Sequence, residues 1–180
     1  KMIQFDFVWR KADIWACERR MHRQACTMDV KYRPNVAGIL RDRKGKILVC
    51  ERVNQKGAWQ FPQGGVDTGE PLMQALYREL EEEIGVTSDL YQVVEQRAGY
   101  RYQFSGGRLK FGNYGGQEQT YFLCEFLGKK GQICIETDDP EFQRTNWLKP
   151  EDFQIKWIPE FKREVYRQVF EDFFAVRLGA

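Results

Sequence analysis

The sequence predicts an α+β fold in which a β-sheet lies between helices, and three observations lead to this prediction. Its 180 residues fit one domain that is large enough to enclose a hydrophobic core. Short apolar runs bounded by Gly, Pro and other turn residues recur along most of the chain, as is typical of strands. Two segments, one central and one near the C-terminal end, instead repeat apolar residues with helical spacing.

The first strands form a hairpin. Residues 36–40 and 47–50 are apolar, and the turn between them, residues 42–45, ends in a glycine that can form the tight corner. Residues 59–61 predict a further short strand, which ends at Pro62 because proline lacks the N–H that a strand ladder needs.

A glycine-rich loop containing Gly64, Gly65 and Gly69 leads into the central helix. Pro71 is expected at the first helical position, where a missing backbone N–H costs nothing. Gly85 is expected to end the helix, because glycine readily adopts the left-handed conformation that follows a last helical turn.

Beyond the central helix the pattern predicts more strands and one last helix. A hairpin turn is expected at residues 105–107, and the last helix begins near Glu160. The predicted strands cover residues 90–94, 100–104, 109–111, 120–126 and 133–135, and the apolar stripe of the last helix consists of Phe161, Val165, Val169 and Phe173.

The first 30 residues are expected to form an N-terminal extension to a domain at residues 31–180. Residues 10–28 place apolar side chains among many charges, which indicates a weakly amphipathic helix or an appendage packed on the main body. Met28 is a plausible natural start of the chain.

Composition excludes several classes of function. Lys and Arg number 28 against 26 Asp and Glu, so no strong net charge drives nonspecific binding to nucleic acid or membranes. No apolar run is long enough to span a membrane, and no membrane or stable protein partner is expected.

The cysteines and the histidine limit the possible chemistry. Cys17, Cys26, Cys50, Cys124 and Cys134 are odd in number and lack CxxC spacing, which disfavours a disulfide framework or a zinc ribbon and fits a reducing cytoplasm. His22 is the only histidine, so catalytic triads and His-ligated zinc are disfavoured. We therefore expect carboxylates to carry any enzymatic chemistry.

Three glutamates of the central helix are the strongest functional signal. Glu79, Glu82 and Glu83 stand at i, i+3 and i+4, so a helix places them on one face within one turn. Their repulsion would be relieved by Mg²⁺ or Mn²⁺, which prefer carboxylate and water oxygens. The alternative is a solvated acidic helix face, which is a common use of such runs.

A helical wheel weighs against that alternative. It places Glu83 between Leu72 and Leu76 of the core stripe, whereas Glu81 points nearly opposite and can be solvated. A carboxylate at a core margin is costly unless it is paired or bound to metal. Arg78 is the expected orienting partner of these carboxylates, with an ordinary surface ion pair as the alternative. The remaining residues of the stripe are Met73, Leu80 and Ile84.

This segment resembles the Nudix box. Gly64, then Glu70 after five residues, then residues 78–86 after seven more match every fixed position of that motif. The resemblance implies a Nudix αβα sandwich, with a mixed sheet between helices, that hydrolyses a nucleoside diphosphate linked to another group.

The same resemblance implies a metal site. Glu79, Glu82 and Glu83 would be ligands of Mg²⁺ or Mn²⁺, and Gly64 would offer its backbone carbonyl. Glu82 or Glu83 would also activate water, and we count Arg78 with this catalytic group.

Further segments are similar to bacterial RNA pyrophosphohydrolases and the related dinucleoside polyphosphate hydrolases. The similarity spans about residues 32 to 170 and is carried by residues 32–36, 59–65, 116–119, 140–142 and 161–166. It implies that Arg33, Arg52 and Lys162 contact phosphates, and that Glu141 is a metal ligand or positions water.

The base of the substrate is assigned to aromatic and amide side chains. By the same similarity, Tyr102 and Phe161 would border the base, although Phe161 could equally pack in the core and Tyr102 could fill space between strands. Gln117 and Gln119 point to one side of a strand and could hydrogen-bond a base or phosphate.

The favoured hypothesis is a hydrolase that removes pyrophosphate from 5′-triphosphorylated RNA or splits dinucleoside polyphosphates such as diadenosine tetraphosphate. Its expected partner is therefore a nucleotide or an RNA 5′ end. Two alternatives stay open: a housecleaning pyrophosphatase of small nucleotides or nucleotide sugars, and a Nudix-fold module that binds nucleotide or RNA ends without hydrolysis.

Overall fold

The computed structural model describes residues 30–137 and 139–179. The helix or appendage expected at residues 10–28, the start at Met28, and the side chains of Cys17, Cys26 and His22 lie outside the described residues.

A mixed sheet forms the centre of the domain. Its strands follow the order β3-β2-β1-β6-β5, with β4 also paired to β1 and β7 to β2. Strand β1 is antiparallel to β2 and β4 but parallel to β6, and β5 is antiparallel to β6. The strands are β1 (Tyr32–Arg41), β2 (Ile47–Arg52), β3 (Trp59–Gln60), β4 (Gln63–Gly65), β5 (Tyr91–Gln103), β6 (Gly116–Phe126) and β7 (Phe142–Leu148).

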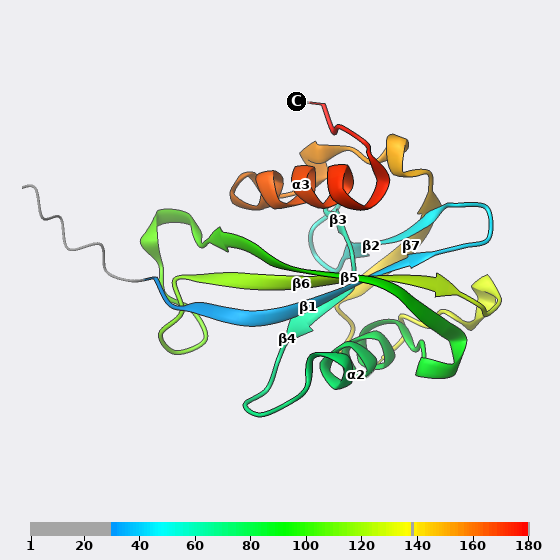
Figure 1. Cartoon of the computed structure of the whole chain (residues 1–180), viewed down its shortest axis with the longest axis horizontal. Helices are drawn as coiled ribbons and strands as arrows, with labels where there is room; N and C mark the ends of the chain where they lie inside the picture. The colour runs from blue at the N-terminus through cyan, green and yellow to red at the C-terminus, as the bar shows by residue number, and fades with distance from the viewer. Residues whose placement is uncertain (1–29, 138, 180) are drawn as a thin grey trace, which may run out of the picture. The chain divides into compact units, whose positions relative to one another are not determined.

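The two main helices cover opposite faces of this sheet (Figure 1). Helix α2 (Leu72–Ile84) packs on one face and α3 (Arg163–Phe174) on the other. Alternate residues of β1 serve the two cores: Val36 and Leu40 belong to the cluster under α2, whereas Ala37 and Ile39 belong to the cluster under α3. The predicted sandwich is therefore confirmed.

Helix α2 begins and ends close to the predicted residues. Pro71 is the N-cap, one position before the predicted place, and Gly85 ends the helix in the left-handed conformation with φ of 65°. The position of the helix is fixed by close packing, since a Cβ at Gly38 would come within 2.8 Å of the Leu80 side chain.

The last helix differs slightly from its prediction. A 3-10 turn, η6 (Glu160–Lys162), precedes α3, so Phe161 lies in the turn rather than in the helix. Val165 and Val169 are buried as predicted, but Tyr166 and Phe170 complete the buried face. Their rings pack around Phe61, which is itself fully buried.

The extents of some strands differ from the prediction. Gly64 and Gly65 belong to β4 rather than to a loop, because their backbone pairs with Asn35 and Val36 of β1. Residues 90–94 and 100–104 are parts of one strand, β5, whose two irregularities of register between them disguised its continuity.

Other errors lie in irregular segments and at a polar edge. Residues 109–111 form no strand, since only an isolated bridge joins Lys110 to Tyr114, and residues 105–107 form a 3-10 turn. Residues 133–135 are irregular, although two of them pack on the α2 core. Strand β7 was missed because the exposed residues between its buried ends are largely polar and show no alternation.

Candidate active site

A cavity of about 620 Å³ brings together most of the predicted site residues. Its walls come from strands β1 to β6, helix α2, the 3-10 turns η5 (Ile155–Trp157) and η6, and the loops that hold Lys110 and Glu141. The predicted residues that line it are Gly64, Glu79, Glu141, Arg33, Arg52, Tyr102, Gln117, Phe161 and Lys162. Arg78, Glu82, Glu83 and Gln119 are not part of the lining.

Strand β4 passes so close to α2 that the carboxylate of Glu79 lies against Gly64. An added Cβ at Gly64 would overlap all three carboxyl atoms of Glu79, so glycine is required for this approach. The Glu79 side chain is only 13% exposed. Burial raises the pKa of its carboxyl, and this outweighs the opposite effect of the Arg78 guanidinium.

Glu83 is a buried carboxylate at the margin of the core, as the helical wheel predicts. It is 7% exposed and accepts a hydrogen bond of 2.8 Å from the backbone N–H of Gln63. Burial raises the pKa of Glu83 well above its usual range, and the charge on Glu141 adds to the rise. Glu83 is therefore the most destabilised carboxylate of the set when it is ionised.

Arg78 ties the box together. Its Nε and Nη2 donate to the two carboxylate oxygens of Glu70 at 3.0 and 2.8 Å, and Nη2 also donates to the carbonyl of Gly65 at 2.9 Å. Nη1 donates to Glu79 at 2.7 Å. The hydrogen bond from Arg78 lowers the pKa of Glu70 to about 2, with help from the backbone N–H of Asp67. The guanidinium thus connects strand β4, Glu70 and helix α2.

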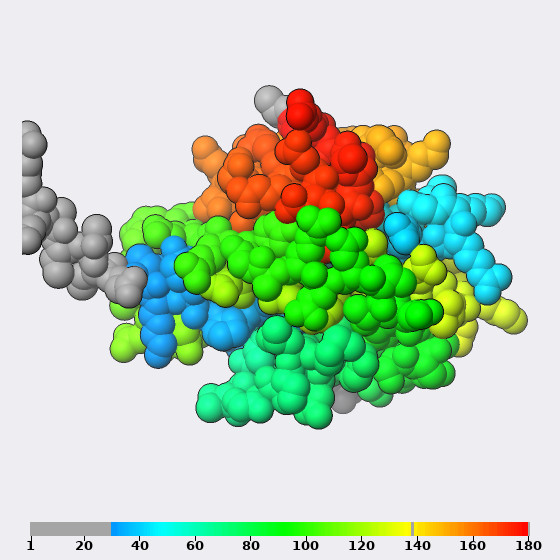
Figure 2. Space-filling view, viewed as in Figure 1, coloured from blue at the N-terminus to red at the C-terminus, as the bar shows by residue number. Residues whose placement is uncertain are grey.

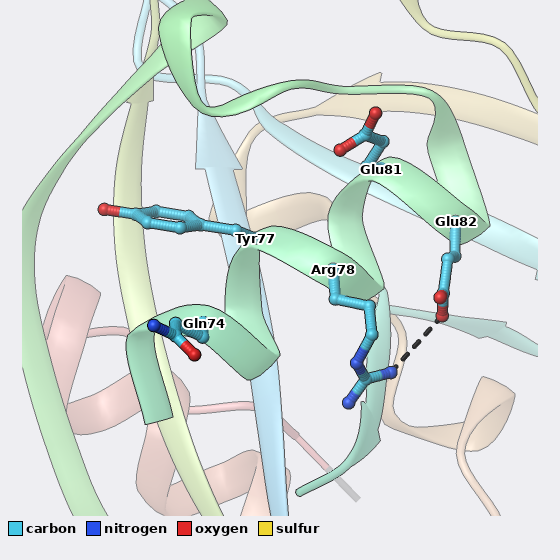
Figure 3. A pocket seen from close by; sticks show the side chains of 5 residues that line it. All are labelled: Gln74, Tyr77, Arg78, Glu81 and Glu82. Atoms are coloured by element: carbon cyan, nitrogen blue, oxygen red, sulfur yellow. Dashed lines mark hydrogen bonds and ion pairs between the residues drawn. The ribbon is translucent and has the colours of Figure 1, made fainter. Parts of the chain in front are cut away.

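Glu82 lies on the outer side of α2. Its side chain is 60% exposed and points toward Arg78, whose Nη1 donates to it at 3.3 Å (Figure 3). A shallow cavity of about 480 Å³ lies beside this pair and is lined by Gln74, Tyr77, Arg78, Glu81 and Glu82. Glu81 is exposed and unpaired with Arg78, as its place on the wheel predicts.

The three box glutamates have different hydrogen-bond partners. Arg78 holds Glu79 and Glu82, whereas Glu83 is held by the backbone of β4. Across the described ranges no three acidic, cysteine or histidine side chains are gathered closely enough to enclose a metal ion. Helical spacing sets where the side chains start, but their ends follow the nearest hydrogen-bond donors.

The donor set nevertheless suits a hard divalent cation. Glu79, Glu82 and Glu83 on α2, the carbonyl of Gly64 in β4 and the carboxylate of Glu141 all offer the oxygen atoms that such ions prefer. Like charges also raise the pKa values of Glu79 and Glu83. A cation placed among them would offset this repulsion.

Positive charges also line the cavity. Nη2 of Arg52 lies 3.8 Å from Oε2 of Glu141. Lys162 is only 9% exposed, and its Nζ lies 4.8 Å from the centre of the Tyr102 ring. Burial lowers the pKa of Lys162 to about 8, and repulsion by Arg52 and Lys110 adds to the effect. The guanidinium of Arg33 lies against Gly65. The cavity therefore holds cationic side chains close to its carboxylates.

Aromatic and amide groups complete the lining. Tyr102 and Phe161 have ring centroids 5.5 Å apart, and the Tyr102 hydroxyl donates to Oε1 of Gln117. Gln119 instead lies fully buried beneath the lining. Its amide donates to Asn35 and Gln63, and its carbonyl accepts from Tyr121, so its polar groups are already satisfied by the protein.

Sequence reasoning missed several lining residues. Lys110 and Phe111 were assigned to a strand, and Gln60 was seen only as part of a motif. Gln60 is 6% exposed, and its Nε2 has no hydrogen-bond partner among the described residues. Trp59 and Trp157 also line the cavity, with ring centroids 6.1 Å apart. No spacing rule links residues 59 and 157, so only the fold could bring them together.

Residues 31–169 match the NUDIX domain. The chain belongs to the NUDIX family. An RNA pyrophosphohydrolase from Erythrobacter litoralis (strain HTCC2594) is 40% identical over 153 residues, which cover 81% of this chain and 92% of the relative. An RNA pyrophosphohydrolase from Helicobacter pylori (strain P12) is 41% identical over 148 residues, which cover 79% and 94%. The predicted family and the predicted enzyme class, a hydrolase of phosphoric anhydride bonds, are confirmed.

Solved structures agree with the fold. The dihydroneopterin triphosphate pyrophosphohydrolase of E. coli superposes with a TM-score of 0.60 at 16% identity, covering 81% of this chain and 98% of that chain. A C. elegans Ap4A hydrolase in a binary complex gives a TM-score of 0.56 at 22% identity, covering 79% and 98%. NUDIX hydrolases generally need divalent metal ions, which agrees with the donor set. Within the described part of the chain, no helix is long and apolar enough to cross a membrane.

Proposed function

We propose that this NUDIX hydrolase removes pyrophosphate from 5′-triphosphorylated RNA and also cleaves dinucleoside polyphosphates. One observation carries the proposal: a single cavity is lined by the carboxylates of Glu79 and Glu141, by the cations Arg33, Arg52 and Lys162, and by the aromatic rings of Tyr102 and Phe161. A polyphosphate attached to a base has matching parts. The names of relatives that are about 40% identical over more than 90% of their own length support the RNA substrate.

In this proposal Glu79, Glu82, Glu83 and Glu141, with the carbonyl of Gly64, hold Mg²⁺ or Mn²⁺. When bound, such an ion lowers the pKa of water and neutralises charge on the phosphates. The raised pKa values of Glu79 and Glu83 support this role, because both indicate that the ionised carboxylates are disfavoured where they are buried.

Glu83 or Glu82 takes the proton from the attacking water. Both are candidates: Glu83 is 7% exposed and held by the backbone N–H of Gln63, whereas the Glu82 side chain is 60% exposed. Arg78 is a positioning residue: it does not line the cavity, but its hydrogen bonds orient Glu79 and fix the Gly65 carbonyl.

Arg33, Arg52 and Lys162 bind the phosphates that are not cleaved. Tyr102 and Phe161 border the base, with Gln117 as a hydrogen-bond partner within reach. Gln119 is left out of the proposed contacts because its polar groups already have partners within the protein.

The catalytic domain comprises residues 31–180, and residues 1–30 are an N-terminal extension. A cytoplasmic location fits Cys50, Cys124 and Cys134, which form no disulfide within the described part of the chain. The substrate partner is a nucleotide or an RNA 5′ end.

The test is a phosphate-release assay with Mg²⁺ on triphosphorylated RNA, a dinucleoside tetraphosphate, free nucleoside triphosphates and a nucleotide sugar. Turnover should be fastest on the first two substrates. Glu82→Gln should reduce turnover by orders of magnitude with an unchanged unfolding temperature. Glu81→Gln is the matched control, since Glu81 lies on the same helix but is exposed and away from Arg78.

Two outcomes would contradict the proposal. Faster turnover of free nucleotides or nucleotide sugars would favour a housecleaning enzyme. Binding without turnover on every substrate would favour a non-hydrolysing module. A Glu82→Gln variant with near-normal turnover would remove the role assigned to Glu82.

A further inference from the structure

A surface rich in basic and aromatic side chains continues from the cavity to one end of the sheet. It comprises the start of β1, the end of β5 and the 104–115 connection, which lie together because Tyr32 pairs with Gly116 of β6 (Figure 1). In Figure 2 the start of the described chain, in blue, likewise lies against green segments. We call this surface the rim; its residues are Lys31, Tyr32, Arg33, Arg101, Lys110, Phe111 and Tyr114.

Cations and rings alternate along the rim. Cζ of Arg33 lies 4.3 Å from the ring centroid of Phe111, and Nζ of Lys31 lies 4.9 Å from the ring centroid of Tyr114. Arg101 lies 5.2 Å from the ring centroid of Tyr32. Such alternation places a positive charge beside each flat apolar face, which is how single-stranded nucleic acid is bound without sequence preference.

Phe111 is held outward by the backbone. It is 57% exposed, and its φ of 52° lies in the left-handed region that a bulky residue rarely adopts. Lys110 and Tyr114 close the turn around it with reciprocal backbone hydrogen bonds of 2.9 and 3.1 Å. One side of the ring contacts Arg33, so the exposed remainder is available to another flat group. A strained position that exposes an apolar ring points to a binding role.

The charge of this region selects the partner. Among residues 31–33 and 101–118 there are five cations and one acidic residue, Glu118, which is paired with Arg101. A negatively charged polymer therefore fits this surface better than an uncharged or apolar partner does. Arg33, Lys110 and Phe111 also line the cavity, so the rim and the cavity form one continuous surface.

We propose that the rim binds the single-stranded RNA that follows the 5′ nucleotide, with a base stacked on Phe111 and phosphates beside Lys31 and Lys110. This inference rests on the proposed function, because it places the RNA 5′ end in the cavity. A base can stack on this ring only when it is unpaired, so a duplex should not bind the rim in this way.

The experiment measures binding rather than turnover. The full chain is titrated into a 3′-labelled RNA hexamer carrying a 5′-monophosphate, and anisotropy gives Kd at several salt concentrations. The hexamer should bind more tightly than the mononucleotide and more tightly than a blunt duplex of the same sequence. Phe111→Ala should weaken hexamer binding by about 5- to 150-fold, the effect of losing one stacked base.

Lys31→Ala is the second variant, and it should lower the slope of log K against log salt by about 0.7, as expected for one lost phosphate contact. Lys44→Ala is the matched control, because Lys44 is exposed in the turn beyond the opposite end of β1. It should leave both Kd and the salt slope unchanged.

The results separate this inference from the proposed function. Equal affinity for hexamer and mononucleotide, equal affinity for the duplex, or wild-type binding by Phe111→Ala would overturn the rim, even if triphosphorylated RNA is hydrolysed. Hexamer binding that depends on Phe111 and Lys31 supports the rim. If this binding occurs without hydrolysis of any RNA, only the proposed activity is wrong.

Discussion

Gly64→Ala tests whether the close approach of β4 to Glu79 serves activity or only packing. The new methyl group would overlap the Glu79 carboxyl. Gly64 does not have positive φ among the described residues, so its backbone accepts alanine without strain. The obstacle is the end of a flexible side chain, which can turn away while the strand stays in place.

Gly64→Ala is expected to change activity far more than stability. Gly-to-Ala changes at compatible positions alter the free energy of unfolding by about 0.4–1 kcal/mol, so unfolding in urea should change little. Nonbonded carbon atoms need about 3.5 Å, so the Glu79 carboxyl must move by more than about 1 Å. A displacement of that size in a catalytic site costs on the order of 10²-fold in kcat/KM.

The assay is phosphate release from triphosphorylated RNA, measured together with urea unfolding, for Gly64→Ala, Glu79→Ala and the double variant. If the methyl group acts through Glu79, the double variant should be no slower than Glu79→Ala alone. Gly131→Ala is the matched control, because nothing lies within 4 Å of an added Cβ there. Turnover of Gly64→Ala within about threefold of wild type, or full additivity of the two changes, would refute the reasoning.

Three further predictions follow from the same site. Arg78→Met should lower the free energy of unfolding at pH 7 by about 2–3 kcal/mol, slightly less than for a fully buried pair. Because the pKa of Glu70 is lowered to about 2, this loss of stability should persist above about pH 4.5 and shrink as the pH falls toward 2. A loss of stability that does not depend on pH in acid unfolding would contradict this prediction. The pKa of Lys162 is lowered to about 8, so its positive charge is present below pH 8 and KM should rise above pH 8. Lys162→Arg should keep KM constant up to pH 9, because arginine stays charged. A wild-type KM that does not change with pH would exclude phosphate binding by charged Lys162. Mg²⁺ or Mn²⁺ at about 100 times its Kd should raise the free energy of unfolding by about 2.7 kcal/mol. A thermal-shift assay should show this stabilisation in the wild type and in Glu81→Ala but not in Glu79→Ala. Equal stabilisation of all three proteins would place the ion elsewhere.

The fold could be predicted where local patterns and tertiary structure agree. Helix α2 carries its own stripe and its terminal glycine, so its extent was predicted to within about one residue at its start. Strand β4 could not be predicted, because three residues containing two glycines form a strand only through pairing with β1. Strand β7 failed for a related reason, since a polar edge strand shows no alternation.

The site shows a similar division. The burial of Glu83 and the exposure of Glu81 follow from helical geometry and were predicted. The separation of Glu82 from Glu83 depends on how Arg78 and the Gln63 backbone attract the carboxylates, which no spacing contains. Phe111 was missed because its exposure depends on a turn closed by a backbone pair, not on any apolar period.

The guanidinium of Arg78 occupies the oxygen of Glu79 at 2.7 Å. This hydrogen bond uses Oε1 and leaves Oε2 of the same carboxylate to face other groups. Because one oxygen is held, the carboxylate cannot rotate freely about its last bond. Helix α2 therefore presents a carboxylate whose direction is set before any ligand arrives.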